Sequence, residues 1–163
     1  MEKTNKQLLD IVIKEISDNE KKSAICSNVL KSLPEWFGID ESTKAYVEGV
    51  KKHHFFVAEI SNKPIGFYSI MKHFPLTWEI YVCGVFPKYH HLGIGSKLQQ
   101  YTENFLKDKN VKFLTVKTLS ESSSDKNYAK TREFYKAQGF IFLEEFKTLW
   151  DEYNPCLFMC KIL

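Results

Sequence analysis

The segment from Trp78 to Ser96 carries the residues best suited to chemistry. A strand-like run, Trp78 to Phe86, leads through Pro87 and a short polar turn into Gly93-Ile94-Gly95-Ser96 and then into a helix. A helix amino terminus presents unpaired backbone N–H groups and the positive end of the helix dipole, so it attracts anions. Glycine lets the backbone approach a ligand closely or adopt a positive φ. The segment predicts a phosphate site, with a tight strand-to-helix turn as the plainer alternative.

Spacing argues against the better-known phosphate motifs. The sequence has no GxxxxGK[ST], the P-loop pattern, and no GxGxxG with an acidic residue after the next strand, the dinucleotide pattern. Arg132 is the only arginine, which argues against a phosphate-reading surface built on guanidinium groups. The backbone of the turn is therefore the expected anion ligand.

A metal centre is not expected. The four cysteines show no CxxC spacing and lie in apolar runs, which favours reduced thiols in the core over disulfides or a zinc site. They are Cys26, Cys83, Cys156 and Cys160.

The elements that must position this turn follow from the hydrophobic patterning. Helical spacing of apolar residues predicts four helices, and strand-like runs predict seven strands. The helices are expected over Glu20–Ser32, from a cap at Ser42 through Val50, after Gly95 through Leu106, and over Tyr128–Gln138. The strands are expected over 7–16, 53–60, 63–74, 77–86, 111–116, 140–146 and 156–162. Asp18 or Asn19 is the expected cap of the first helix.

The order of these elements is β, α, α, β, β, β, α, β, α, β, β. It combines an antiparallel meander with crossover helices, so we expect an α/β fold with a mixed sheet and helices on both faces. A chain of 163 residues has the usual length of one domain, and no repeat or boundary is visible, so residues 1–163 are expected to form a single domain.

The composition excludes several classes of protein. A hydrophobic content of 44% is too high for a disordered chain, and no apolar stretch approaches the length of a membrane span. The net charge of +3 comes from mixed Lys and Glu without a basic stripe, which argues against nucleic-acid binding. The run from Met1 to Asp10 lacks the apolar block of a secretory signal. We therefore expect a cytoplasmic protein.

Two blocks of this sequence resemble the GNAT superfamily of N-acetyltransferases. The family signature after the fourth strand is Arg or Gln, two residues, Gly, one residue, then Gly or Ala; His90, Gly93 and Gly95 hold the matching positions. The run TREFYKAQGF, Thr131 to Phe140, is similar to the family's FY-x3-GF passage. The resemblance implies the GNAT acyl-CoA N-acyltransferase fold, a mostly antiparallel seven-stranded sheet flanked by about four helices.

The resemblance also implies acetyl-CoA as cosubstrate. Its pyrophosphate would be bound by backbone amides of the turn, and its pantetheine would pair like an extra strand beside the fourth strand. The implied coenzyme residues are Cys83, Gly84, Val85, His90, His91, Leu92, Gly93, Ile94, Gly95 and Ser96. Gly84 suits either a bulge or close packing against a neighbour. Because His90 replaces Arg or Gln, either histidines add phosphate attraction or they face solvent while the amides bind.

The resemblance supplies candidates for catalysis. Glu79 is similar in position to a glutamate of many relatives, and it would accept a proton from the attacking amine directly or through water. Strand alternation places Glu79 on the same face as Tyr81 and Cys83, because the bulge considered at Gly84 comes after them. Tyr135 looks like the family's tyrosine that donates a proton to the departing sulfur. Each of the two has a purely structural alternative, and Cys83 is expected to pack rather than attack.

The acceptor is expected to be a small-molecule or peptide amine. The family usually shapes its acceptor pocket with the loop between the first two helices, where Trp36 and Phe37 stand beside Glu35, Asp40 and Glu41. Such a loop attracts cations by charge and cation–π contacts, or it simply packs on the sheet. The reaction implied is direct attack by a primary amine in a ternary complex. The alternative is a catalytically silent acyl-CoA-binding module of the same fold, and a homodimer is possible for either.

Overall fold

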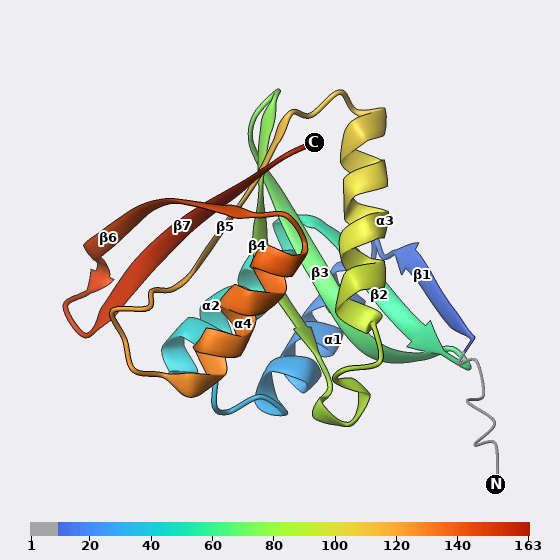
Figure 1. The fold of residues 1–163 in the computed structure, drawn as a ribbon. Coiled ribbons are helices and arrows are strands. Elements are labelled where there is room, and N and C mark those ends of the chain that lie inside the picture. The colour runs from blue at the N-terminus through green and yellow to red at the C-terminus, as the bar shows by residue number, and fades with distance from the viewer. Residues whose placement is uncertain (1–9) are drawn as a thin grey trace, which may run out of the picture.

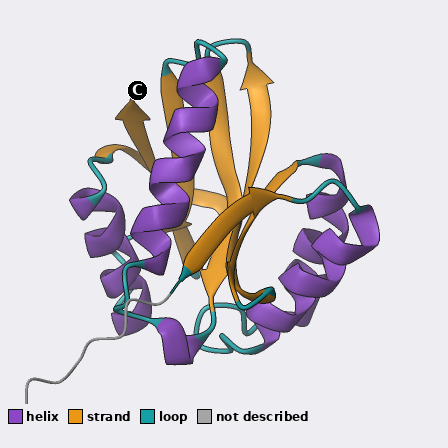
Figure 2. Ribbon diagram, turned by 90° about the vertical axis from the view of Figure 1, so that its right-hand side faces the viewer, coloured by secondary structure: helices purple, strands orange, loops and turns teal. Residues whose placement is uncertain are grey.

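The computed structural model describes residues 10–163, in which a mixed sheet carries helices on both faces (Figures 1 and 2). The strands are β1 (Ile11–Glu15), β2 (His54–Ile60), β3 (Lys63–Phe74), β4 (Thr77–Val85), β5 (Phe113–Leu119), β6 (Ile141–Asp151) and β7 (Asn154–Ile162). The helices are α1 (Asn19–Lys31), α2 (Asp40–Gly49), α3 (Ile94–Asp108) and α4 (Lys126–Ala137), with 3₁₀ turns η1 (Val50–Lys52) and η2 (Pro87–Tyr89). This order confirms the predicted one.

Element ends differ from the predictions where local contacts decide them. The Asp18 carboxylate caps α1, as expected, by accepting from the Lys21 amide at 2.8 Å. In contrast, α2 begins before Ser42 and has no side-chain cap; acidic residues in its first turn favour the helix dipole instead. β6 runs past the predicted end to Asp151, whose carboxylate accepts two turn amides that close the β6–β7 hairpin. The predicted start of β1, residues 7–9, lies outside the described residues.

The sheet contains seven strands in the order β1-β2-β3-β4-β5-β7-β6, which confirms the expected mixed sheet. Every neighbouring pair is antiparallel except β4 and β5. β4 pairs with β5 only over Thr77–Ile80, whereas it stays paired with β3 as far as Val85. The two central strands therefore diverge after Ile80, and the second half of β4 has a free edge.

The helices pack over two separate apolar cores, one on each face of the sheet. α3 and α4 cover one face, where a core of residues such as Phe56, Tyr68 and Leu98 is buried. α1 and α2 cover the other face of β2 to β4, over a second core that includes Val29 and Phe67. Figure 2 shows the two helical layers on opposite sides of the strands. The divergence of β4 and β5 thus lies beneath α4 on one face and beside α2 on the other.

A β-bulge at Tyr81 redirects β4. Ser69 of β3 is opposite Val82, and the next pair joins Ile70 to Ile80, so Tyr81 is the extra residue. The bulge was expected at Gly84, which instead pairs in register. The alternative for Gly84, close packing, holds: a Cβ there would lie 2.9 Å from Cγ1 of Val29 in α1.

Candidate active site

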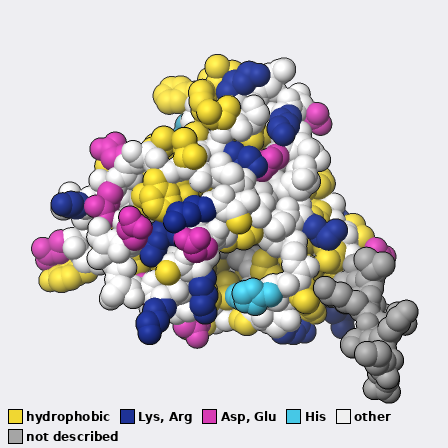
Figure 3. Space-filling view, viewed as in Figure 1, with side chains coloured by type: hydrophobic (Ala, Val, Ile, Leu, Met, Phe, Trp, Pro, Cys, Tyr) yellow, Lys and Arg dark blue, Asp and Glu magenta, His cyan; other side chains and the backbone are white. Residues whose placement is uncertain are grey.

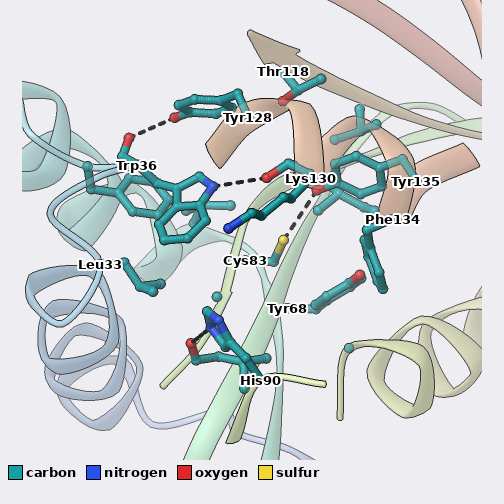
Figure 4. A pocket seen from close by; sticks show the side chains of 18 of the residues that line it. Leu33, Trp36, Tyr68, Cys83, His90, Thr118, Tyr128, Lys130, Phe134 and Tyr135 are labelled. Atoms are coloured by element: carbon teal, nitrogen blue, oxygen red, sulfur yellow. Dashed lines mark hydrogen bonds between the residues drawn. The ribbon is translucent and has the colours of Figure 1, made fainter. Parts of the chain in front are cut away.

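A cleft of about 590 Å³ opens where β4 and β5 diverge. Its walls come from β4, the turn before α3, α4, and the loop between α1 and α2 (Figure 4). Figure 3 shows a hollow on this face with a histidine at its edge. The predicted site residues in the lining are Trp36, Phe37, Cys83, Gly84, Val85, His90, His91, Gly93, Ile94, Gly95, Ser96 and Tyr135. Glu79 and Leu92 are the predicted residues that do not line it.

The amino terminus of α3 forms one end of the cleft. The helix has no side-chain cap, and its first internal hydrogen bond runs from the Lys97 amide to the Gly93 carbonyl at 3.0 Å. Within the described chain, the amides of Ile94, Gly95 and Ser96 have no acceptor. Three free N–H groups and the helix dipole point the same way, so this end can bind a phosphate with the backbone alone.

The two glycines of the turn have different tasks. Gly93 has φ +80° and open space around its Cβ position, so its conformation requires glycine. Gly95 has an ordinary φ, but a Cβ on it would lie 3.1 Å from the Phe134 ring of α4. Gly93 therefore shapes the turn before α3, while Gly95 lets α3 approach α4.

His90 takes neither of the two expected arrangements. Its Nε2 donates to the Val85 carbonyl at 2.7 Å, and its ring lies edge-on to Trp36 at 6.0 Å between centroids. A carbonyl only accepts, so Nε2 carries a hydrogen in this contact. His90 thus ties the turn back to the end of β4, whereas His91 is exposed with φ +60°.

The middle of the cleft holds a cluster of one thiol and two phenols. Cys83 Sγ lies 3.3 Å from the hydroxyl of Tyr135, a buried residue. Burial raises the pKa of Tyr135 well above its usual value near 10, so the hydroxyl keeps its proton. Burial also raises the pKa of Cys83 to about 11, which leaves a thiol rather than a nucleophilic thiolate at neutral pH. Tyr68, directly opposite Cys83 on β3, completes the cluster.

Glu79 lies buried on the opposite face of β4 from this cluster. Its Oε2 accepts from Lys117 Nζ at 2.7 Å and contacts His73 Nε2 at 2.8 Å. It shares a face with Tyr81 but not with Cys83, because the bulge at Tyr81 comes earlier than expected. Four residues of strand separate Glu79 from Cys83 by about 13 Å between Cα atoms. Because Tyr135 lies beside Cys83, the two predicted catalytic side chains, Glu79 and Tyr135, make no direct contact among the described residues.

The loop after α1 bridges the cleft to α4. Trp36 Nε1 donates to Thr131 Oγ1 at 3.0 Å, and the Tyr128 hydroxyl donates to the Trp36 carbonyl at 2.7 Å, as the dashed lines in Figure 4 show. Phe37 packs edge-on against Tyr46. The neighbouring carboxylates that were expected to attract a cation, those of Glu35, Asp40 and Glu41, do not line the cleft.

Several lining residues escaped the sequence reasoning. They are Tyr68, Lys117, Thr118, Tyr128, Lys130 and Trp150. Tyr128 and Lys130 precede the FY-x3-GF block on the same predicted helix as Tyr135. Their short separation from Tyr135 along that helix could have indicated that they line the same site. Tyr68, Lys117 and Trp150 enter the cleft through strand register, for which the sequence offered no signal.

Two further findings concern the residues from 10 to 163. No group of His, Cys, Asp and Glu side chains in this range could hold a metal ion. No helix in the same range is long and apolar enough to cross a membrane.

The fold and the cleft agree with a known family of structures. A GNAT-family protein from Desulfovibrio desulfuricans matches with a TM-score of 0.80 at 16% identity, covering 93% of this chain and 98% of that one. A GNAT acetyltransferase from Elizabethkingia anophelis, solved with acetyl-CoA bound, matches with a TM-score of 0.72 at 19% identity, covering 94% and 98%. An aminoglycoside 6'-N-acetyltransferase in complex with coenzyme A matches with a TM-score of 0.72 at 18% identity, covering 93% of this chain and 96% of that one. At such low sequence identity, the structural similarity shows the fold alone.

Sequence comparison identifies the family. No curated protein sequence matches the chain. The family model for the acetyltransferase (GNAT) domain matches residues 51–142, more than half of the chain. The matched range contains the diverging β4 and β5, the glycine turn before α3 and all of α4. The chain therefore belongs to the GNAT acetyltransferase family.

Proposed function

We propose that the protein transfers the acetyl group of acetyl-CoA to the nitrogen of a primary amine, by direct attack in a ternary complex. The observation that carries this proposal is the cleft itself. Free helix amides form one end, and the thiol and phenol cluster lies where β4 and β5 separate. An elongated ligand with a phosphate at one end and a thioester at the other fits this arrangement of groups along the cleft.

The coenzyme residues of the proposal come from the turn and the free half of β4. Backbone amides from His91 to Ser96 would bind the pyrophosphate, and His90 would hold the turn in place through Val85. The pantetheine amides would pair with the edge of Cys83, Gly84 and Val85, which β5 leaves free. Leu92, exposed in the same turn, would contribute its backbone only.

The reaction needs a neutral amine, a partner for the tetrahedral oxyanion and a proton for the leaving thiolate. A free alkyl amine titrates near about 10.4, so a base is required at neutral pH. Glu79 would take the proton through water, because Lys117 and His73 occupy its Oε2 and leave Oε1 without a partner among the described residues. Tyr135 would donate to the departing sulfur, and a backbone N–H near Val85 would meet the oxyanion. No metal is needed for these steps.

A silent acyl-CoA-binding module is the alternative. The separation of Glu79 from Tyr135 gives it support, since a binder needs no base. Thiol release from acetyl-CoA, measured with a panel of primary amines, separates the two functions. Release that depends on the amine supports catalysis, whereas coenzyme affinity without such release identifies a binder.

Three other properties stay predictions. They are a single domain over residues 1–163, a cytoplasmic location and a homodimer. Substitution of propionyl-CoA for acetyl-CoA in the same assay tests whether the acyl group is only acetyl.

A further inference from the structure

The lining of the cleft has an unusual balance of charge. No Asp or Glu is among the lining residues of the described chain, whereas Lys117 and Lys130 both are. Lys117 is paired with Glu79 outside the lining. Lys130 is exposed and takes part in none of the ion pairs formed by residues 10–163. The cleft therefore carries an uncompensated positive charge.

The cleft that Lys130 lines also has aromatic walls. Trp36, Tyr46, Tyr81, Tyr128 and Trp150 line the same cleft, supplied by four separate elements and the loop after α1. Figure 4 shows the Lys130 side chain reaching into the space between the Trp36 and Cys83 side chains. Flat apolar surfaces of this kind bind flat apolar bodies, and an ammonium ion binds carboxylates.

We infer that the acceptor is a small amine with an aromatic body and a carboxylate, of the aromatic amino acid class, whose carboxylate pairs with Lys130. This inference rests on the proposed function and names its substrate class. A cleft with lysines and no carboxylates also disfavours the ammonium form of an acceptor and so favours the neutral amine that attacks. The same charge repels polycations such as polyamines and aminoglycosides.

Steady-state kinetics with three amines at saturating acetyl-CoA test the inference. We expect kcat/KM to be highest for phenylalanine, about tenfold lower for phenethylamine, which lacks the carboxylate, and lowest for spermidine. Lys130→Met should lower kcat/KM for phenylalanine to the value for phenethylamine and leave kcat/KM for phenethylamine unchanged. Lys126→Met, on the same helix but outside the cleft, is the matched control and should change neither.

Three results would overturn the inference. Spermidine as the fastest of the three amines would do so. A Lys130→Met protein with a raised KM for acetyl-CoA and unchanged discrimination between amines would assign Lys130 to the coenzyme instead. Activity with other amines but not with these would exclude the class, whereas no activity with any amine would sink the proposed function itself.

A separate observation concerns Tyr68. Its side chain is 2% exposed, and its hydroxyl has no hydrogen-bond partner within the described residues. It lines the cleft opposite Cys83, whose thiol contacts Tyr135. Burial raises the pKa of Tyr68 well above 10, so the hydroxyl is a donor that lacks an acceptor. A buried unpaired hydroxyl destabilises a fold unless a ligand pairs with it.

The geometry points to Tyr68 as a donor to the thioester group of bound acetyl-CoA, a role separate from the one proposed for Tyr135 at the departing sulfur. This role also rests on the proposed function, but binding alone can test it. Tyr68→Phe removes only the hydroxyl. We expect its affinity for acetyl-CoA to fall about fivefold while its affinity for coenzyme A, which has no thioester, stays within twofold.

Thermal unfolding separates this role from a structural one. Because the hydroxyl is unpaired without ligand, Tyr68→Phe should unfold at the wild-type temperature or above it. Tyr101→Phe, a partly buried tyrosine that packs on Phe56 outside the cleft, is the control and should bind both ligands as the wild type does. Equal losses of affinity for acetyl-CoA and coenzyme A, or a lower unfolding temperature with unchanged affinities, would refute the role of Tyr68.

Discussion

The two ends of the cleft are built from different parts of the chain. The end proposed to bind the phosphates, here called the phosphate end, is made of backbone amides from one continuous turn, in which Gly93 and Gly95 are the positions that the structure restricts. The end proposed to bind the acceptor, here called the acceptor end, is made of side chains from the α1–α2 loop, α2, α4, β4, β5 and β6. A turn that binds through its backbone tolerates substitution of most side chains, and its short motif can be recognised in the sequence. A pocket assembled from distant segments changes when any of those segments changes. The coenzyme is therefore easier to infer from the sequence than the acceptor.

The largest expected effect lies where the two ends meet. Tyr135→Phe removes the donor to the departing sulfur but keeps the packing of its ring on Phe140. Loss of one donor aimed at developing charge lowers kcat by about 10²- to 10³-fold. Acetyl-CoA affinity, measured by calorimetry, should change little. A variant with the wild-type kcat would remove Tyr135 from the reaction and leave its hydroxyl as a partner of Cys83 alone.

Glu79→Gln tests whether the acceptor end depends on the carboxylate. If Glu79 is the base, kcat falls by about 10²-fold, since general base catalysis contributes at least that much. Glu103→Gln is a matched control, because Glu103 is buried to a similar degree and pairs with a lysine, but its partner Lys161 does not line the cleft, whereas the Glu79 partner Lys117 does. Both variants should lose stability by breaking an ion pair. Equal kcat values for the two variants would assign Glu79 to holding Lys117 and His73, with no part in proton transfer.

Local patterns predicted the order of the elements and the turn with free backbone amides before α3. Each helix and strand carries its own periodicity, and the Gly93 turn needs only its neighbours in the sequence. The bulge at Tyr81 was not predictable, because it depends on the register between β3 and β4. The same limit explains why Glu79 was expected on the face of Cys83. The aromatic wall likewise depends on Trp150, which reaches the cleft only through the long β6–β7 hairpin.

Gly93→Ala tests the claim that the phosphate end depends on backbone conformation. A Cβ at φ +80° costs about 1–2 kcal/mol, or roughly five- to thirtyfold in coenzyme affinity if the turn must relax to avoid it. Gly139→Ala is the control, since Gly139 has φ +91° and lies outside the cleft. Both should lower stability, but only Gly93→Ala should lower the affinity for coenzyme A. Equal affinities would mean that side chains, not this backbone, bind the phosphates.

The smallest expected effect separates the two histidines of the same turn. His90→Ala removes the hydrogen bond to Val85, which is worth about 1 kcal/mol, so coenzyme A affinity should fall about fivefold. Nε2 carries its hydrogen in both the neutral and the charged ring, and the loss should therefore be the same at pH 6 and pH 8. His91→Ala, in the same turn but exposed, should bind as the wild type does. A loss confined to pH 6 in either variant would instead show that an imidazolium attracts the phosphates, and the coenzyme end would then depend on side-chain charge as the acceptor end does.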